Sequence, residues 1–229
     1  MKKLVKKIPG VLNLYNKIRS NRLKNQDAKA VFTSIYEKNY WKDSTSISGS
    51  GSNDTQTEKI VAELPKLLAT HSITSILDIP CGDFYWFKKI NLDNINYVGA
   101  DIVEDIINNN KQYASKNISF QTMNLLEDTL PKVDLIIIRD CLVHFSYSDI
   151  KRAIKQVVDS GSTYLLTTSF INLQDNTDIE TGMWRAINLQ KAPLNFSEPI
   201  DMIQENCDEV EGKYYDKSLA LWSINAISY

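Results

Sequence analysis

The chain has 229 residues, 43% of them hydrophobic and 24% charged, enough to bury the core of one large α/β domain. No apolar run approaches the roughly 20 residues that a membrane-spanning helix requires. The three cysteines, Cys81, Cys141 and Cys207, are far apart and lack metal-ligand spacing, which excludes a disulfide framework and predicts neither a zinc site nor any other metal site. We expect a cytoplasmic protein.

The first 30 residues are basic and the rest of the chain is acidic. They hold nine Lys and Arg and one acid, Asp27, leaving 17 basic and 27 acidic residues elsewhere. Their start resembles a signal peptide but lacks a long apolar stretch and a small-residue cleavage site, so we expect it to be retained. Nucleic acid is an unlikely partner, because an acidic body repels the phosphate backbone.

Apolar residues recur at helical spacing within this basic segment. They are Leu4, Ile8, Val11, Leu12, Tyr15 and Ile18. The pattern fits peripheral contact of residues 1–24 with the anionic inner face of a membrane. It also fits a solvated helix that docks on the body through its apolar stripe, and Pro9-Gly10 interrupts that stripe.

Two further helices and a flexible loop are predicted before residue 75. Residues 27–41 and 55–71 have helical patterns, and the Ser/Gly-rich stretch between them is typical of a loop. We therefore predict that residues 1–74 form a helical extension and lid, and that residues 75–229 form the main domain.

From residue 75, short apolar runs alternate with segments long enough for crossover helices. The runs span 75–79, 97–102, 118–124, 133–140, 163–170 and 218–224. Nearly continuous apolar runs are typical of strands buried on both faces. The pattern predicts a doubly wound, mostly parallel α/β sheet.

Polar residues at the ends of these runs are the candidate site, because ligands bind beyond the carboxyl ends of such strands. Asp78 ends the first run and leads into a loop with Gly82, and Asp101 follows that glycine by 19 residues. This is near the ~20-residue offset of an acid that binds ribose hydroxyls. Asn124 and the pair Arg139-Asp140 end the next two runs.

The loop after Asp78 does not fit a dinucleotide. The G-x-G-x-x-G pattern is absent, Pro80 has no amide hydrogen, and Phe84 is expected to block close approach of a pyrophosphate. The residues indicate a ligand with a ribose, a base and a positive charge.

With these residues the chain resembles the class I S-adenosylmethionine-dependent methyltransferases over about residues 75–229. The resemblance implies a seven-stranded Rossmann-like sheet with S-adenosylmethionine as cofactor. It implies these contacts: Asp78, Pro80, Cys81 and Gly82 to methionine, Asp101 and Ile102 to ribose, and Asn124 and Leu125 to adenine. The family usually has glycine at the positions of Pro80 and Phe84.

The motif R-D-x-x-x-H at 139–144 is similar to that of phosphoethanolamine methyltransferases and of several small-molecule and sugar methyltransferases. The resemblance implies that Asp140 lines the pocket and that His144 orients or deprotonates the acceptor, and we count both as catalytic candidates. Arg139 is counted among the cofactor contacts. If a helix begins at Asp140, the two side chains share a face of its first turn. A packed His144 and an Asp140–Arg139 salt bridge remain the structural alternatives.

Residues 37–51 are similar to the N-terminal lid of the same enzymes, apart from an insertion at 42–45. The resemblance implies that the lid closes over the cofactor through Tyr40, Trp41, Ser48 and Gly49.

Residues 178–196 follow the fifth run and mix aromatic with hydrogen-bonding groups, which suits a polar acceptor. Trp184, Arg185 and Asn188 are the candidate acceptor-binding residues, with a core-filling Trp184 as the alternative. We expect methyl transfer to an oxygen or nitrogen of a small-molecule or glycan-type acceptor. A catalytically silent cofactor-binding scaffold at a membrane and an NAD-dependent oxidoreductase remain as rivals, and the oligomeric state is open.

Overall fold

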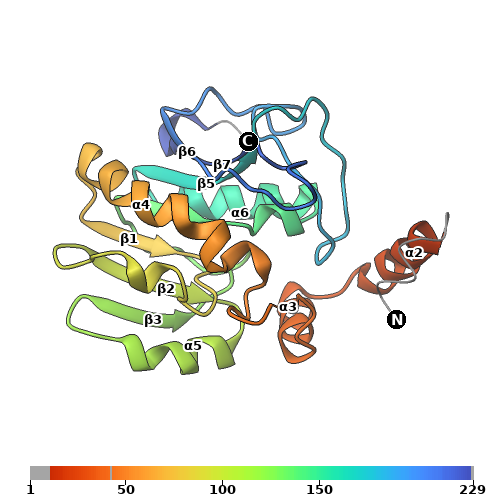
Figure 1. The fold of residues 1–229 in the computed structure, drawn as a ribbon, viewed down its shortest axis with the longest axis horizontal. Helices are drawn as coiled ribbons and strands as arrows, with labels where there is room; N and C mark the ends of the chain where they lie inside the picture. The colour runs from red at the N-terminus through yellow and green to blue at the C-terminus, as the bar shows by residue number, and fades with distance from the viewer. Residues whose placement is uncertain (1–10, 42, 228–229) are drawn as a thin grey trace.

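The computed structural model describes residues 11–41 and 43–227. Within these residues, seven strands form one sheet in the order β3-β2-β1-β4-β5-β7-β6 (Figure 1). The strands are β1 (Ser75–Asp78), β2 (Asn96–Asp101), β3 (Ile118–Thr122), β4 (Leu135–Ile138), β5 (Tyr164–Phe170), β6 (Asp201–Gln204) and β7 (Lys217–Ser223). In this sheet β7 pairs antiparallel with both β5 and β6, and the other four pairs of neighbours are parallel. The predicted doubly wound, mostly parallel sheet is confirmed.

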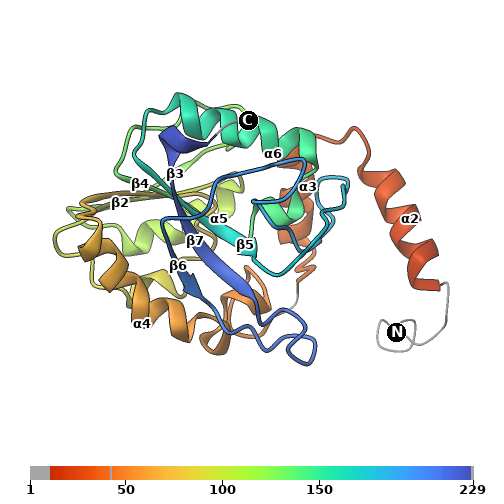
Figure 2. The same cartoon turned by 90° about the horizontal axis from the view of Figure 1, so that it is seen from above.

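Helices cover both faces of this sheet. The α-helices among the described residues are α2 (Val11–Leu23), α3 (Ala28–Glu37), α4 (Asp54–Thr70), α5 (Glu104–Asn110) and α6 (Tyr147–Asp159), of which α2 does not lie on the sheet. Figures 1 and 2 show α4 and α6 on opposite faces. The buried residues of α6, Ile150, Ala153, Ile154 and Val157, recur at helical spacing and form the stripe that packs on the sheet.

The central strands can be predicted from their apolar runs because they are buried on both faces. All four residues of β4 are buried, and one hydrophobic cluster lies on each side of the sheet. The α4 residues Ile60 and Leu64 are fully buried in one cluster, so this helix belongs to the body although it precedes residue 75.

Two local predictions differ from the structure. No helix begins at Asp140, which has a left-handed φ of 51°. A short 3-10 turn, Leu142–His144, follows, and α6 begins only at Tyr147 after its cap Ser146. Asp140 and His144 therefore do not share a helical turn. The strand β6 was also absent from the six apolar runs.

The N-terminal part of α2 stands away from the body beyond α3 (Figures 1 and 2), whereas Arg19 in its C-terminal part contacts Gly182. Leu14, Tyr15 and Ile18 are 60%, 42% and 45% exposed, so this part of the apolar stripe is not buried against the body, although the Tyr15 hydroxyl lies 3.4 Å from that of Tyr40. The predicted stripe residues Leu4 and Ile8 lie outside the described residues. Among the residues described, no helix is both long and apolar enough to cross a membrane.

Candidate active site

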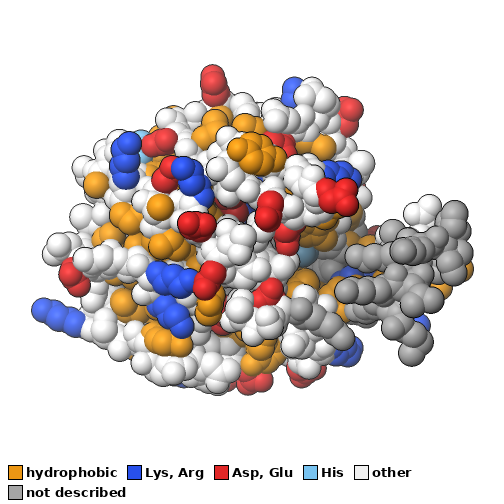
Figure 3. Space-filling model, in the orientation of Figure 1, with side chains coloured by type: hydrophobic (Ala, Val, Ile, Leu, Met, Phe, Trp, Pro, Cys, Tyr) orange, Lys and Arg blue, Asp and Glu red, His pale blue; other side chains and the backbone are white. Residues whose placement is uncertain are grey.

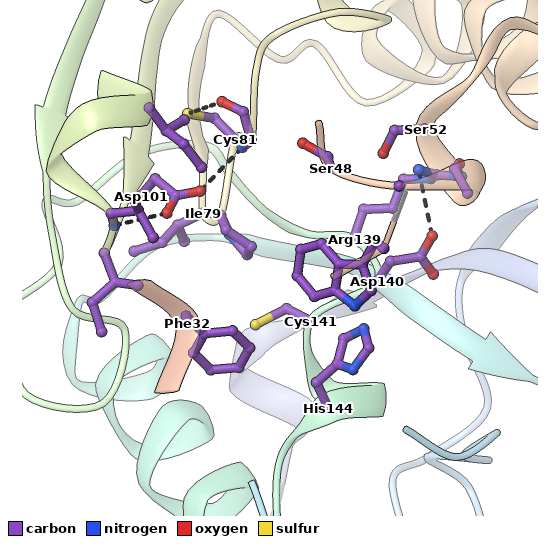
Figure 4. Close-up of a pocket in the computed structure, with 18 of the residues that line it drawn as sticks. Phe32, Ser48, Ser52, Ile79, Cys81, Asp101, Arg139, Asp140, Cys141 and His144 are labelled. Carbon is purple, nitrogen blue, oxygen red and sulfur yellow. Dashed lines mark hydrogen bonds and ion pairs between the residues drawn. The ribbon is translucent and has the colours of Figure 1, made fainter. Parts of the chain in front are cut away.

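A cavity of about 270 Å³ lies at the carboxyl edge of the sheet. It opens where the strand order reverses, between β1 and β4, which is the place where doubly wound sheets bind ligands. Figure 4 shows Cys81 and Asp101 on one side of it, and Asp140 and His144 on the other. The strand-end residues predicted as a site thus surround one space.

Two buried carboxylates form the first side of the cavity. Asp78 ends β1 and accepts a hydrogen bond from the Tyr97 hydroxyl at 2.7 Å. Burial raises the pKa of Asp78 to about 7, against the opposing effects of Tyr97 and the Arg139 charge. Burial likewise raises the pKa of Asp101 to about 6, although backbone amides donate to that carboxylate. Neither carboxylate forms an ion pair with any residue that the structure describes, which suits a cationic or hydroxyl-bearing ligand.

Three amides of the loop after β1, those of residues 81–83, are already engaged within the protein. The Cys81 amide donates to Ala100 O at 2.8 Å, the Gly82 amide to Asp101 Oδ2 at 3.2 Å, and the Asp83 amide to Ser48 Oγ at 3.2 Å. Between β1 and β2 the chain forms only a 3-10 turn, Phe87–Lys89, so no α-helix N-terminus faces the cavity from this segment.

Phe84 does not block this loop as expected. Its ring is 2% exposed and packs among Phe87, Tyr97, Tyr113 and Phe120 in the core. The expectation that Phe84 would block a dinucleotide was therefore wrong. The argument against a dinucleotide rests instead on the engaged amides of residues 81–83.

The predicted lid closes on this loop through Asp83. The Asp83 carboxylate accepts hydrogen bonds from Ser46 Oγ at 2.9 Å and from the Ile47 amide at 3.0 Å. The fit is close, because a Cβ added to Gly82 would lie 2.2 Å from Ser48 Oγ.

Three of the four predicted lid residues, Trp41, Ser48 and Gly49, line the cavity. The fourth, Tyr40, does not: its ring lies under the guanidinium of Arg19, 4.0 Å from ring centroid to Cζ.

A network of four charges, three of them buried and Asp140 partly exposed, forms the second side. Arg139 pairs with Glu205 through Nη2 and Oε2 at 2.7 Å and donates to the lid carbonyl of Gly51 at 2.8 Å. Asp140 pairs with Lys217 at 2.6 Å and more weakly with Arg139 at 3.5 Å. Burial by itself would raise the pKa of Asp140, but Lys217 and Arg139 outweigh it and lower the pKa to about 2. Asp140 is therefore an ionised wall residue rather than a proton acceptor.

His144 presents one ring nitrogen to the cavity. Its Nδ1 lies 2.8 Å from the carbonyl oxygen of Met183, so Nδ1 donates and Nε2 keeps its lone pair. The Trp41 ring lies beside the imidazole, with the centroids 5.4 Å apart. Burial lowers the pKa of His144, despite the opposing effects of the Met183 carbonyl and Asp140. The imidazole is neutral at pH 7 and can accept a proton.

The segment 178–196 reaches the cavity only through Trp184. This side chain is 45% exposed and packs edge-on against Phe170 and Tyr214, which also line the cavity. Arg185 donates to the carbonyls of Leu142 and Phe145, and Asn188 to those of Ile171 and Leu173. Arg185 and Asn188 therefore hold the chain in place away from the cavity, contrary to the predicted acceptor contact.

The remaining predicted contacts, Pro80, Ile102, Asn124 and Leu125, all line the cavity. Several other lining residues were not predicted from the sequence: Phe32, Gly51, Phe170, Tyr214 and Lys217. Phe170 ends β5, so the strand-end rule applied to the fifth run would have found it. On the face of the body shown in Figure 3, acidic and basic side chains are interspersed, without the continuous basic field typical of nucleic-acid binding.

Comparison with known proteins gives a structural likeness only. No family model and no curated protein matches the sequence. A SAM-dependent methyltransferase from Leishmania major is 14% identical with a TM-score of 0.64 over 88% of this chain and 89% of that one. Magnesium protoporphyrin IX methyltransferase from Synechocystis, with bound SAM, is 12% identical with a TM-score of 0.58 over 87% and 98%. The N-methyltransferase NodS from Bradyrhizobium japonicum is 16% identical with a TM-score of 0.52 over 76% and 98%. With its seven-stranded sheet and these neighbours, the chain has the Rossmann-like methyltransferase fold.

Proposed function

We propose that the protein transfers a methyl group from S-adenosylmethionine to an oxygen or nitrogen of a small-molecule or glycan-type acceptor. The observation that carries the proposal is the single cavity with Asp78 and Asp101 on one side and the free Nε2 of His144 on the other. The first pair suits a ribose and a positive charge, and the imidazole suits an acceptor proton. The structurally similar methyltransferases support the same interpretation.

The donor set of the loop fits this cofactor better than a dinucleotide. S-adenosylmethionine supplies an electrophilic methyl group on a sulfonium and carries no phosphate. Asp78 would balance positive charge at the end of β1, Asp101 would bind ribose hydroxyls, and Asn124 and Leu125 would meet the base. The engaged amides of residues 81–83 would leave a pyrophosphate unsolvated.

The residues of the opposite side would hold the acceptor. His144 Nε2 would take a proton from the acceptor as it attacks, while Trp41 beside it limits the access of water. The rings of Phe170, Trp184 and Tyr214 offer an apolar wall, and Lys217 and Asp140 offer fixed charges, so a small acceptor with both apolar and polar groups fits. Positioning of the two reactants supplies the rest of the acceleration.

A calorimetric titration tests the proposal against its rivals. S-adenosylhomocysteine is expected to bind with micromolar affinity, and NADH at the same concentrations is expected to give no binding heat. Binding of NADH alone would identify an oxidoreductase. Binding of S-adenosylhomocysteine without any methylated product in an acceptor screen by mass spectrometry would leave the catalytically silent scaffold.

A second proposal concerns α2, which we expect to contact an anionic lipid surface. Its exposed side chains Leu14, Tyr15 and Ile18 lie in a segment with nine Lys and Arg and one acid among the first 30 residues. Apolar side chains that enter the interface, together with lysines that attract anionic headgroups, are typical of peripheral helices.

Replacing Leu14 and Ile18 with serine is expected to weaken binding to phosphatidylglycerol vesicles about thirtyfold in a sedimentation assay. Each substitution removes about 1 kcal/mol of partial apolar burial. Ile200→Ser is the matched control, because Ile200 is 53% exposed on the body. Equal vesicle binding by the double variant and the control would contradict the proposal.

A further inference from the structure

Two chain segments hold His144 from opposite sides. On one side the Trp41 ring lies beside the imidazole. On the other, the segment 182–185 runs along residues 143–144: the Gly182 amide donates to His144 O at 2.8 Å, and the Arg185 amide to Val143 O at 3.0 Å. The same segment supplies the Met183 carbonyl that fixes the imidazole tautomer. The position of His144 therefore depends on the distance between these two segments.

One side chain from α2 joins them. Arg19 Nη2 donates to the carbonyl of Gly182 at 2.8 Å, next to Met183. Its Nη1 donates to the hydroxyl of Tyr40, next to Trp41, and its guanidinium lies 4.0 Å from the centroid of the Tyr40 ring. An arginine can make these contacts together because its planar group both stacks and donates along several directions.

The packing around Gly182 shows that the extension fits this segment closely. Gly182 has a φ of 96°, in the left-handed region that favours glycine. A Cβ at this position would lie 2.5 Å from Val31 Cγ1 of α3 and 3.4 Å from both terminal carbons of Leu23 in α2. The contact of Arg19 is thus part of a packed interface between the N-terminal extension and the acceptor side of the cavity.

From this geometry we infer that Arg19 is a positioning residue, which fixes His144 for the acceptor by tying Tyr40–Trp41 to Gly182–Met183. The inference rests on the proposed function for the role of His144. It gives α2 a role in positioning an active-site residue, in addition to the proposed contact with an anionic lipid surface. A change in the position of α2 relative to the body would then displace the imidazole of His144 through one side chain, that of Arg19.

The charges around His144 give a readout that needs no acceptor. Three charged side chains act on it: Arg19 from α2, Asp140 from the end of β4, and Arg185 from the segment after β5. Removing Arg19 takes away a positive charge that acts on the ring. This loss favours the protonated imidazole, so the pKa of His144 should rise.

The experiment is an NMR titration of the two histidines in Arg19→Ala and in Arg22→Ala, the control that removes an exposed arginine of the same helix. His71, which pairs with Asp201 at 3.0 Å, is the internal reference. In Arg19→Ala the midpoint of His144 should rise by about half a pH unit, as expected for one partly screened charge. Its ring ¹⁵N shifts should also show loss of the pure Nδ1–H tautomer. His71 in both variants, and His144 in Arg22→Ala, should remain as in the wild type.

A second variant keeps the test decisive if Arg19→Ala is unstable. Arg19→Lys retains the charge but not the planar contacts, so the His144 midpoint should stay near that of the wild type while the tautomer mixture appears. Wild-type midpoint and tautomer in both folded variants would overturn the inference. Failure of the wild type to bind S-adenosylhomocysteine would instead overturn the proposed function, whatever the histidines do.

Discussion

Asp101→Ala is expected to weaken binding of S-adenosylhomocysteine by tenfold or more. Hydrogen bonds to a charged group contribute about 1.5–3 kcal/mol, and a factor of ten corresponds to about 1.4 kcal/mol. The carboxylate lies at the end of β2, at the cavity, and its oxygens also accept from the amides of Gly82 at 3.2 Å and Val103 at 2.9 Å. Alanine therefore removes a ribose contact and loosens the glycine loop.

The matched control is Asp105→Ala, which removes an exposed carboxylate from the first turn of α5. Asp101→Asn separates the two effects, because its amide oxygen can still brace one backbone amide but carries no charge. Calorimetry of all three variants gives the comparison. Wild-type affinity in Asp101→Ala would remove Asp101 from the site.

The affinity for S-adenosylhomocysteine should also depend on pH through Asp101 and Asp78. Burial raises the pKa of Asp101 to about 6 and that of Asp78 to about 7. The ligand favours the ionised forms, so protons compete with it, and the affinity should fall as the pH is lowered from 8 through 7 to 5. Asp101→Ala should lose the lower part of this dependence and keep the part that belongs to Asp78.

The sheet was largely predictable because its central strands are buried on both faces. Leu135–Ile138 is one continuous apolar run, which is typical of a strand buried on both faces. The strand β6 lacks that signal: it lies at the edge of the sheet, where Met202 is 42% exposed and Ile203 is buried. A four-residue strand with one buried apolar side chain cannot be told from a loop by its pattern.

The site was predictable where function follows the ends of parallel strands. Asp78, Asp101 and Asp140 were found by that rule, and all three reach the cavity. Lys217 was missed because β7 is antiparallel: its first residue pairs with Phe170, the last residue of β5, and so lies at the same edge. The orientation of that strand had not been predicted from the sequence.

Polar residues of the segment 178–196 show a different limit. Arg185 and Asn188 have the donors of an acceptor site, but those donors bind backbone carbonyls of two turns, at 142–145 and 171–173. Such carbonyls must be paired wherever a chain turns away from water. The sequence shows which side chains carry donors, but not which backbone groups need a partner. A residue that binds an acceptor and one that pairs with backbone carbonyls therefore cannot be told apart before the fold is known.

His144→Ala is expected to lower the rate of methyl transfer by about 10²–10⁴, the usual contribution of a general base. The affinity for S-adenosylhomocysteine should change less than about threefold, because the cofactor contacts lie on the other side of the cavity. The reason is the tautomer: Nδ1 donates to Met183 O at 2.8 Å, which leaves Nε2 free to take the acceptor proton. Burial keeps the pKa of His144 below its ordinary value of 6.5, so the base form is already present at pH 7.

The sign of the pH effect follows from that direction. At saturating S-adenosylmethionine the rate should rise with pH through a midpoint below 6.5 and stay level above pH 7. His71→Ala is the matched control, because it removes the other histidine from its pair with Asp201. His144→Asn can keep a hydrogen bond to the Met183 carbonyl but cannot accept a proton, so it should be as slow as the alanine variant. A fall of less than about threefold in His144→Ala would make the imidazole structural, and the acceleration would then come from positioning alone.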